Sequence, residues 1–177
     1  MMKRAVWGSV LVVIFAAALW AGTASEAIAT DVKFPGAYST AGEIVPGLVF
    51  RGLSIFNDDG TFIANNIAQF GDPAIDGRLA TEWYGVWVKT GPRSLTVTYY
   101  FYRADPATGL VNGVVKGTSF AEWDKSGDAG TATYIAEVFP CPGGPLTCPE
   151  PADLPVLSAQ SPQAQTGSFT FRRLPVY

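Results

Sequence analysis

The side chains that could do chemistry in this chain are a few polar and aromatic groups set within strand-like segments. Histidine is absent from all 177 residues. This excludes histidine-dependent triads, histidine-ligated metal sites and imidazole pH switches. An acid or base would have to be a carboxylate, a tyrosine or a lysine, and the mid-strand candidates are Glu82, Tyr99 and Glu137. No spacing pairs these three, so we assign no catalytic residue and no metal ligand, and we expect no cofactor.

The same segments fit a binding site better than an active site. Isolated polar groups orient a ligand in an apolar cavity, and aromatic rings supply its walls. An inward Arg51 would orient an anionic group, and an asparagine such as Asn65 is disfavoured in mid-strand unless it has a role. An inward Glu137 beside Arg51 or Arg103 would form a buried ion pair. The candidate ligand-binding residues are Arg51, Asn65, Trp83, Trp87, Tyr99, Arg103 and Glu137.

Each of these candidates has a structural alternative. An arginine can lie along apolar surface at the end of a barrel with its charge in water. An asparagine can sit in a bulge or be a hydrogen-bonded core amide, and the tryptophans can be core residues. The strand around Tyr99 has aromatic residues on both faces, so one set points inward in either orientation. This strand is therefore compatible with both a filled core and a cavity.

The two cysteines form a separate constellation. Cys141 and Cys148 bracket the six residues Pro-Gly-Gly-Pro-Leu-Thr. Two thiolates without histidine make a poor zinc site, and six intervening residues do not match a Cys-x-x-Cys redox motif. In an oxidising compartment the pair predicts a disulfide. A loop this short gives about 2–2.5 kcal/mol in the chain-entropy model, so the bridge would hold a loop and not the fold.

The first 29 residues have the pattern of an export signal. Lys3 and Arg4 precede an apolar run over residues 5–21, and small residues lead to Ala27-Ile28-Ala29. We expect cleavage after Ala29, a secreted or periplasmic location, and no stable membrane anchor in the mature chain. An uncleaved anchor is the alternative, because the apolar run is near the lower length limit for crossing a bilayer.

The composition restricts the partners. The chain has 12 Lys and Arg against 15 Asp and Glu, a net charge of −3. This argues against nucleic acid, because phosphate binding needs a clustered positive surface. The 19 glycines and 13 prolines indicate many turns.

Residues 30–177 are expected to form one all-β domain. Runs of β-branched and aromatic residues alternate with turns such as Asn57-Asp58-Asp59-Gly60. An eighth strand is possible within residues 37–44 of the N-terminal lead-in, and residues 140–166 form a long loop that carries the cysteines. The seven main strands are expected at residues 47–56, 61–70, 80–89, 94–104, 110–123, 131–139 and 167–174.

Consecutive strands joined by short turns predict an antiparallel up-and-down meander. A flat sheet of this length would leave two exposed edges, and closing it into a barrel removes them. We therefore expect an antiparallel up-and-down β-barrel of about 7–8 strands, which is wide enough for a filled core or one small ligand. A β-sandwich is the alternative.

Three pieces of the chain resemble a known class of proteins. They are Gly60-Thr61-Phe62, the hairpin at residues 85–93, and Thr98-Tyr99-Tyr100-Phe101 with the turn at residues 105–109. Over roughly residues 47–122 the chain resembles small secreted bacterial proteins with a lipocalin-like (calycin) barrel, which are mostly uncharacterised. A weaker likeness is to allene oxide cyclase and dirigent barrels. The resemblance implies a small antiparallel barrel.

Three functions are compatible with these features. The first is an exported barrel that binds a small apolar or aromatic molecule. The second is a histidine-free barrel enzyme of the isomerase or cyclase type. The third is an envelope interaction protein with a filled core that acts through the loop at residues 140–166. The number of large inward side chains separates the third from the others. A carboxylate or tyrosine beside a cavity arginine would favour the enzyme over the binder.

Overall fold

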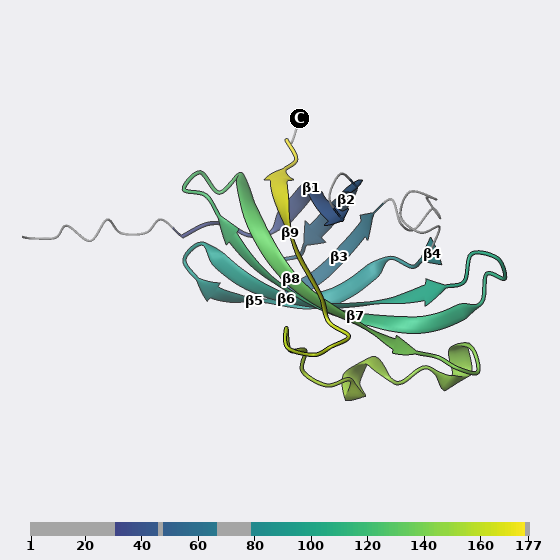
Figure 1. Cartoon of the computed structure of the whole chain (residues 1–177). Coiled ribbons are helices and arrows are strands. Elements are labelled where there is room, and N and C mark those ends of the chain that lie inside the picture. The colour runs from purple at the N-terminus through teal and green to yellow at the C-terminus, as the bar shows by residue number, and fades with distance from the viewer. Residues whose placement is uncertain (1–30, 46–47, 67–78, 176–177) are drawn as a thin grey trace, which may run out of the picture.

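The computed structural model describes residues 31–45, 48–66 and 79–175, and the predicted export signal lies outside these ranges. Two short 3₁₀ helices, Pro145–Thr147 (η3) and Pro151–Asp153 (η4), lie in the loop before the last strand. All other regular elements of the described residues are strands (Figure 1). They are β1 (Gly36–Val45), β2 (Leu48–Phe56), β3 (Thr61–Asn66), β4 (Leu79–Ala80), β5 (Trp83–Gly91), β6 (Ser94–Ala104), β7 (Val111–Trp123), β8 (Ala129–Pro140) and β9 (Gln165–Arg173).

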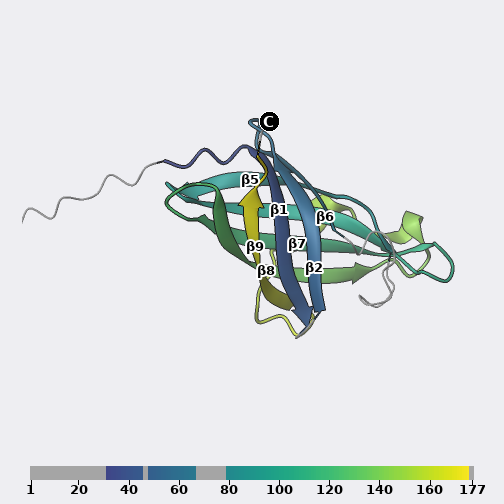
Figure 2. The ribbon, with the colours of Figure 1, turned by 90° about the horizontal axis from the view of Figure 1, so that it is seen from above.

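Eight of these strands form a closed antiparallel barrel. Each long strand pairs with the next long strand along the chain, and β9 pairs with β1 to close the ring. Figure 2 shows β1, β2 and β9 side by side, crossing over the strands of the opposite wall. The predicted up-and-down barrel is therefore confirmed, and the β-sandwich alternative is wrong. The eighth strand is β1, in the lead-in where it was expected.

The predicted strand at residues 80–89 is interrupted near its start. Leu79 and Ala80 pair with the end of β6 as β4, and pairing resumes in β5 with the register shifted by one residue. Between them Thr81 donates its N–H to the Tyr102 carbonyl and accepts the Tyr102 N–H on its hydroxyl, both at 3.0 Å. An extra residue of this kind is a β-bulge, which re-aims the side chains that follow it. The bulge points Trp83 into the barrel.

Aromatic side chains fill the barrel at one end. Trp123 is 1% exposed and Tyr38 is completely buried. The Trp123 ring lies 4.5 Å from Phe171 and 4.8 Å from Phe34 between centroids. Phe34 comes from the lead-in and closes this end of the barrel. Its ring also contacts Trp87. Edge-to-face contacts of this kind add to the free energy gained by burying the rings.

The lead-in is tied to the strands that it closes. Val32 donates its N–H to the Pro92 carbonyl at 2.9 Å. The Arg173 guanidinium donates to the carbonyls of Lys33 and Pro35. Lys89 forms an ion pair with Asp31 at 2.7 Å. We call this end, which carries the turns at residues 57–60, 91–93 and 124–128, the closed end of the barrel.

Buried phenols predict loss of stability in alkali. Burial raises the pKa of Tyr38, Tyr99 and Tyr134 above the ordinary value. A raised pKa means that the unfolded chain releases the proton first, so this stabilisation is complete below about pH 10 and falls as the pH rises beyond it. Tyr99→Phe should make the fall shallower by up to about 1.4 kcal/mol per pH unit. Denaturant unfolding of both proteins between about pH 8 and 12 measures this, and identical slopes would contradict it.

Candidate functional site

Part of the inner wall of the barrel changes from buried to solvent-accessible along its length. On β6 the inward residues Leu95, Val97 and Tyr99 are buried, whereas Phe101 and Arg103, nearer the far end, are partly exposed. We call that far end, which carries the turn at residues 105–110, the open end.

β8 and β9 show the same gradient, whereas the inward Phe50 of β2 and Val115 of β7 stay buried near the open end. On β8 the inward Ala132 is 2% exposed, while Ala136 and Val138 are partly exposed. On β9 Phe171 is buried and Phe169 is partly exposed. Solvent therefore reaches the inside of the barrel from the open end. We refer to the partly exposed inward residues there as the open-end wall: Asn66, Trp83, Phe101, Arg103, Tyr134, Ala136, Val138 and Phe169.

Trp83 forms a flat aromatic platform in this wall. Its ring stacks on Tyr99 at 4.8 Å and 5° between planes, and on Phe101 at 4.9 Å and 12°. Tyr99 in turn lies over Gly117, where an added Cβ would be 2.1 Å from the Tyr99 Cζ. Tyr99 and Phe101 thus hold the Trp83 ring in place, and the partly exposed Trp83 and Phe101 present aromatic surface at the open end.

Polar groups lie beside the platform. The Trp83 Nε1–H is buried and donates to no acceptor among the residues that the structure describes. Buried donors are nearly always satisfied, so this unpaired N–H carries a free-energy cost. Arg103 lies one inward position beyond Phe101, opposite Gly113 of β7. Asn66 ends β3 on the inner face.

Three of the predicted binding residues thus belong to this region, and Trp87 does not. Trp83 and Arg103 are in the open-end wall, and Tyr99 lies behind it. Trp87 lies at the closed end, where its indole N–H donates to the Asn57 carbonyl at 3.1 Å and its ring contacts Phe34. Its surroundings are those of a core residue, the alternative role considered from the sequence.

Arg51 and Asn65 lie on the outside of the barrel. The Arg51 side chain is exposed, and Asn65 Oδ1 accepts the Leu53 N–H at 3.3 Å. The interpretation of Arg51 as an inward residue is therefore wrong. Of the two adjacent asparagines it is Asn66 that faces inward, because Asn66 pairs with Gly52 on the face that carries the buried Ser54 and Phe56.

Glu137 also points outward, so the predicted ion pair with Arg51 or Arg103 is wrong. Glu137 lies opposite Lys116 in the β7–β8 ladder, and both are 8% exposed. They are covered by the long loop between β8 and β9. Ser161 donates its hydroxyl to Glu137 Oε1 at 3.1 Å, so Glu137 holds the loop against the barrel.

Lys116 is the second anchor of that loop, and the sequence analysis missed it. Its Nζ donates to the carbonyls of Leu154 and Pro155 at 3.0 and 2.9 Å and lies 5.7 Å from the Tyr100 ring centroid. Leu154 is buried against the outer face of the sheet. A single lysine in the middle of β7, between Val115 and Gly117, was the signal that could have identified it.

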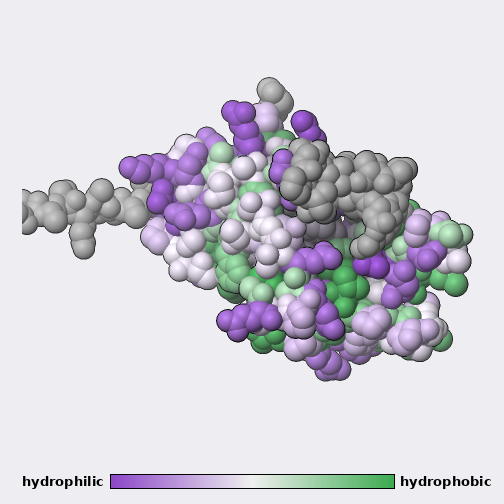
Figure 3. Space-filling view, in the orientation of Figure 1, coloured by the Kyte–Doolittle hydropathy of each residue, from purple (hydrophilic) through white to green (hydrophobic). Residues whose placement is uncertain are grey.

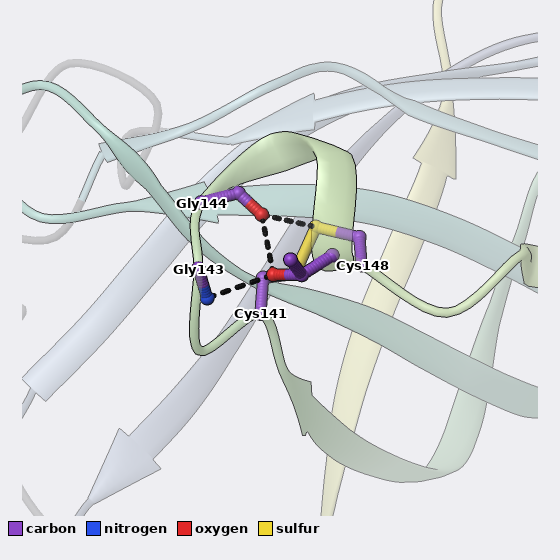
Figure 4. The surroundings of a disulfide bond; sticks show 5 residues. Cys141, Gly143, Gly144 and Cys148 are labelled. Atoms are coloured by element: carbon purple, nitrogen blue, oxygen red, sulfur yellow. Dashed lines mark hydrogen bonds between the residues drawn. A yellow bond between two sulfur atoms is a disulfide. The ribbon is translucent and has the colours of Figure 1, made fainter.

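The predicted disulfide is confirmed at the start of the loop. Cys141 and Cys148 are joined with an S–S distance of 2.03 Å. Figure 4 shows the tight turn that they enclose, in which Gly143 donates its N–H to the Thr147 hydroxyl and that hydroxyl donates to the Gly144 carbonyl. Cys141 also donates its N–H to the Asn112 carbonyl at 3.0 Å. The bridge fixes where the loop leaves the barrel.

Removing the Lys116 anchor should release the loop. Lys116→Met keeps the apolar stem but leaves two loop carbonyls without their charged donor, which should cost about 1–3 kcal/mol. We expect limited proteolysis to cut within residues 150–164 several-fold faster than in the unmodified protein. Lys125→Met, which alters an exposed lysine in the β7–β8 turn, is the matched control. Equal cleavage rates in both variants would show that Lys116 does not hold the loop.

The acid–base candidates do not meet at the open-end wall. Glu82 is exposed and accepts the Tyr84 hydroxyl proton at 2.7 Å, Glu137 is outside, and Tyr99 is buried with its pKa raised. Among the described residues no aspartate or glutamate belongs to that wall. Within the same residues no group of three or more potential metal ligands gathers, and no helix is long and apolar enough to cross a bilayer.

Comparison with protein-family models, curated proteins and solved structures found no match to this chain. The resemblance to lipocalin-like and cyclase or dirigent barrels therefore stays a prediction.

Proposed function

We propose that this protein is an exported β-barrel that binds a small apolar or aromatic molecule at its open end. The observation that carries the proposal is the exposure gradient along the inner wall, where buried aromatic residues give way to partly exposed Trp83 and Phe101. Apolar surface that water reaches inside a concave wall is the usual setting of a small-molecule site. Covering one aromatic face there would release about 1–2 kcal/mol through stacking and area burial.

The same wall favours a binder over the two alternatives. An isomerase or cyclase without histidine would need a carboxylate or an ionisable tyrosine in contact with its substrate, and the described wall offers one partly buried phenol, Tyr134, whose pKa burial raises. An interaction protein with a filled core would bury its inward residues at both ends. The polar members of the wall, Asn66 and Arg103, fit the orienting groups of a largely apolar site.

Export is part of the proposal. The disulfide suits an oxidising compartment, and the basic and apolar segments before residue 30 suit a cleaved signal. The net charge of −3 fits a partner other than nucleic acid.

Tryptophan fluorescence tests the site. Titration with a neutral apolar naphthylamine dye should quench the protein's emission, because Trp83 lies in the wall that the dye would cover. Trp83→Phe should keep binding, measured by the dye's own emission, and lose most of the quenching. Trp87→Phe, at the closed end, is the matched control and should retain it. Equal quenching in both variants, or no dye binding to the purified protein, would reject the proposal.

A further inference from the structure

A second concave surface lies outside the barrel, on the strands where the chain closes on itself. It is a groove of about 820 Å³ across the outer face of β1 and its neighbours β2 and β9. The outward residues of β1 in the groove, Ser39 and Ala41, are small, so β1 forms the floor of the groove. Arg51 of β2 and Arg172 of β9 stand on either side of that floor.

The surface next to the groove is weakly polar. In Figure 3 the face over β8 and β9 is mostly pale, neither strongly hydrophilic nor strongly hydrophobic. The outward side chains there include Thr131 and Thr170, which lie opposite one another in the ladder. Hydroxyl groups thus continue from the groove onto the adjoining strands.

The two arginines of the groove have no acidic partner among the described residues. Arg93 and Arg173 each lie within ion-pair distance of a carboxylate, at 3.6 and 3.8 Å. Neither Arg51 nor Arg172 does so within the part of the chain that the structure describes, and both side chains are exposed. Their guanidinium groups are therefore ready to bind an anion in the geometry that suits carboxylates.

The groove also offers uncharged hydrogen-bonding groups near the arginines. Asn65 uses its Oδ1 to accept the Leu53 N–H, which leaves the amide Nδ2 as a donor. The hydroxyls of Ser39 and Thr170 donate to the carbonyls of Arg172 and Ala41, at 3.3 and 3.2 Å. Each hydroxyl oxygen then has lone pairs left to accept a bond from a ligand hydroxyl.

The spacing of the arginines sets the length of the ligand. Arg51 pairs with Ala41, and Arg172 pairs with Ser39 two residues away on β1. Two strand spacings and two residues put their Cα atoms roughly 12 Å apart. The two exposed guanidinium groups can therefore contact two separate anionic groups of one extended ligand.

We propose that this outer groove binds an acidic oligosaccharide, with one sugar carboxylate on Arg51, another on Arg172, and ring hydroxyls on Asn65, Ser39 and Thr170. A nucleotide fits less well, because single bases bind by stacking on aromatic rings and the outward residues of the groove include none; its one aromatic residue, Phe171, faces the core. The side chains named for the groove point outward and those of the open-end wall point inward, so this site is independent of the proposed function.

Calorimetry on the full protein tests the groove with three probes: a galacturonate trimer, the neutral maltotriose and inorganic phosphate. Arg51→Ala and Arg172→Ala should each weaken trimer binding by about tenfold, since each removes a charge-assisted contact. Binding should also weaken as salt is added, because both charges are exposed. Lys125→Ala removes an exposed positive charge elsewhere and is the matched control.

Several results would overturn the proposal. They are no binding of the trimer, maltotriose binding as tightly as the trimer, or phosphate binding with the same affinity and the same response to both arginine variants. Equal losses in Lys125→Ala would also overturn it, because the effect would then reflect net charge alone. Dye binding at the open end should be unchanged in Arg51→Ala and Arg172→Ala, so the two sites can fail separately.

Discussion

Trp123→Ala should lower the free energy of unfolding by about 3–5 kcal/mol, the range for truncating a large buried aromatic residue. Trp123 is 1% exposed and its ring lies within 6 Å of the rings of Tyr38, Phe56 and Phe171, as well as that of Phe34. Its removal leaves a cavity between strands on opposite walls and the lead-in, and those rings cannot all move to fill it. Denaturant unfolding followed by circular dichroism measures the loss.

Phe120→Ala is the matched control for this prediction. Phe120 lies three residues earlier on the same strand, but its side chain points outward and is 48% exposed. Truncating it should cost less than about 1 kcal/mol, as most surface changes do. Similar losses in the two variants would mean that the aromatic cluster does not hold the closed end together.

Ala136→Trp should abolish dye binding at the open end, with a loss of at least about tenfold, equivalent to about 1.4 kcal/mol of binding free energy. Ala136 is a small, partly exposed inward residue opposite Gly117, the glycine on which Tyr99 packs. An indole there projects into the space that the ligand would occupy, next to the Trp83 platform.

Ile135→Trp separates occlusion from a general effect of a larger residue. Ile135 is the preceding residue on β8, so its side chain points to the opposite face of the sheet, opposite Thr118. This variant should bind the dye normally. Circular dichroism shows whether both variants fold. If Ala136→Trp folds and still binds the dye as tightly as Ile135→Trp, the site is not inside the barrel.

The alternation of residue types predicted most of the fold, because in a closed meander each strand pairs with the strands next to it in the chain. Strands with short turns between them pair with their neighbours in the chain, and only the pairing of β9 with β1 joins distant segments. That closure was inferred from the cost of leaving two edges. The bulge at Thr81 and Glu82 was not predicted, since a one-residue register shift has no distinctive sequence pattern.

The faces of individual strands were harder to assign from the sequence. On β2 the inward Phe50 and Phe56 alternate with the outward Leu53 and Ile55, which are 49% and 44% exposed. Because both faces of β2 are apolar, the alternation divides its residues between two faces but does not show which face is inside the barrel. The sequence therefore left the face of Arg51 open, and the structure places it outside, in a groove with Asn65, another predicted binding residue.

The outward position of Glu137 has a different cause. The mid-strand position of Glu137 suggested an inward carboxylate, but its side chain points outward and a long loop folded onto the outer face buries it. Leu154 and the Lys116 anchor hold that loop down, below the barrel in Figure 1. Loop docking depends on contacts between residues 24 to 39 positions apart, and no local pattern in the sequence encodes them.

The central claim is that a small apolar molecule binds inside the open end, and an NMR titration of the isotope-labelled protein with the apolar dye tests it most directly. We predict saturable amide shifts at Phe101, Ala136 and Val138, all fitting one affinity. Shifts confined to the exposed outer residues Tyr84, Val86 and Val88, or no saturable shifts at all, would contradict it.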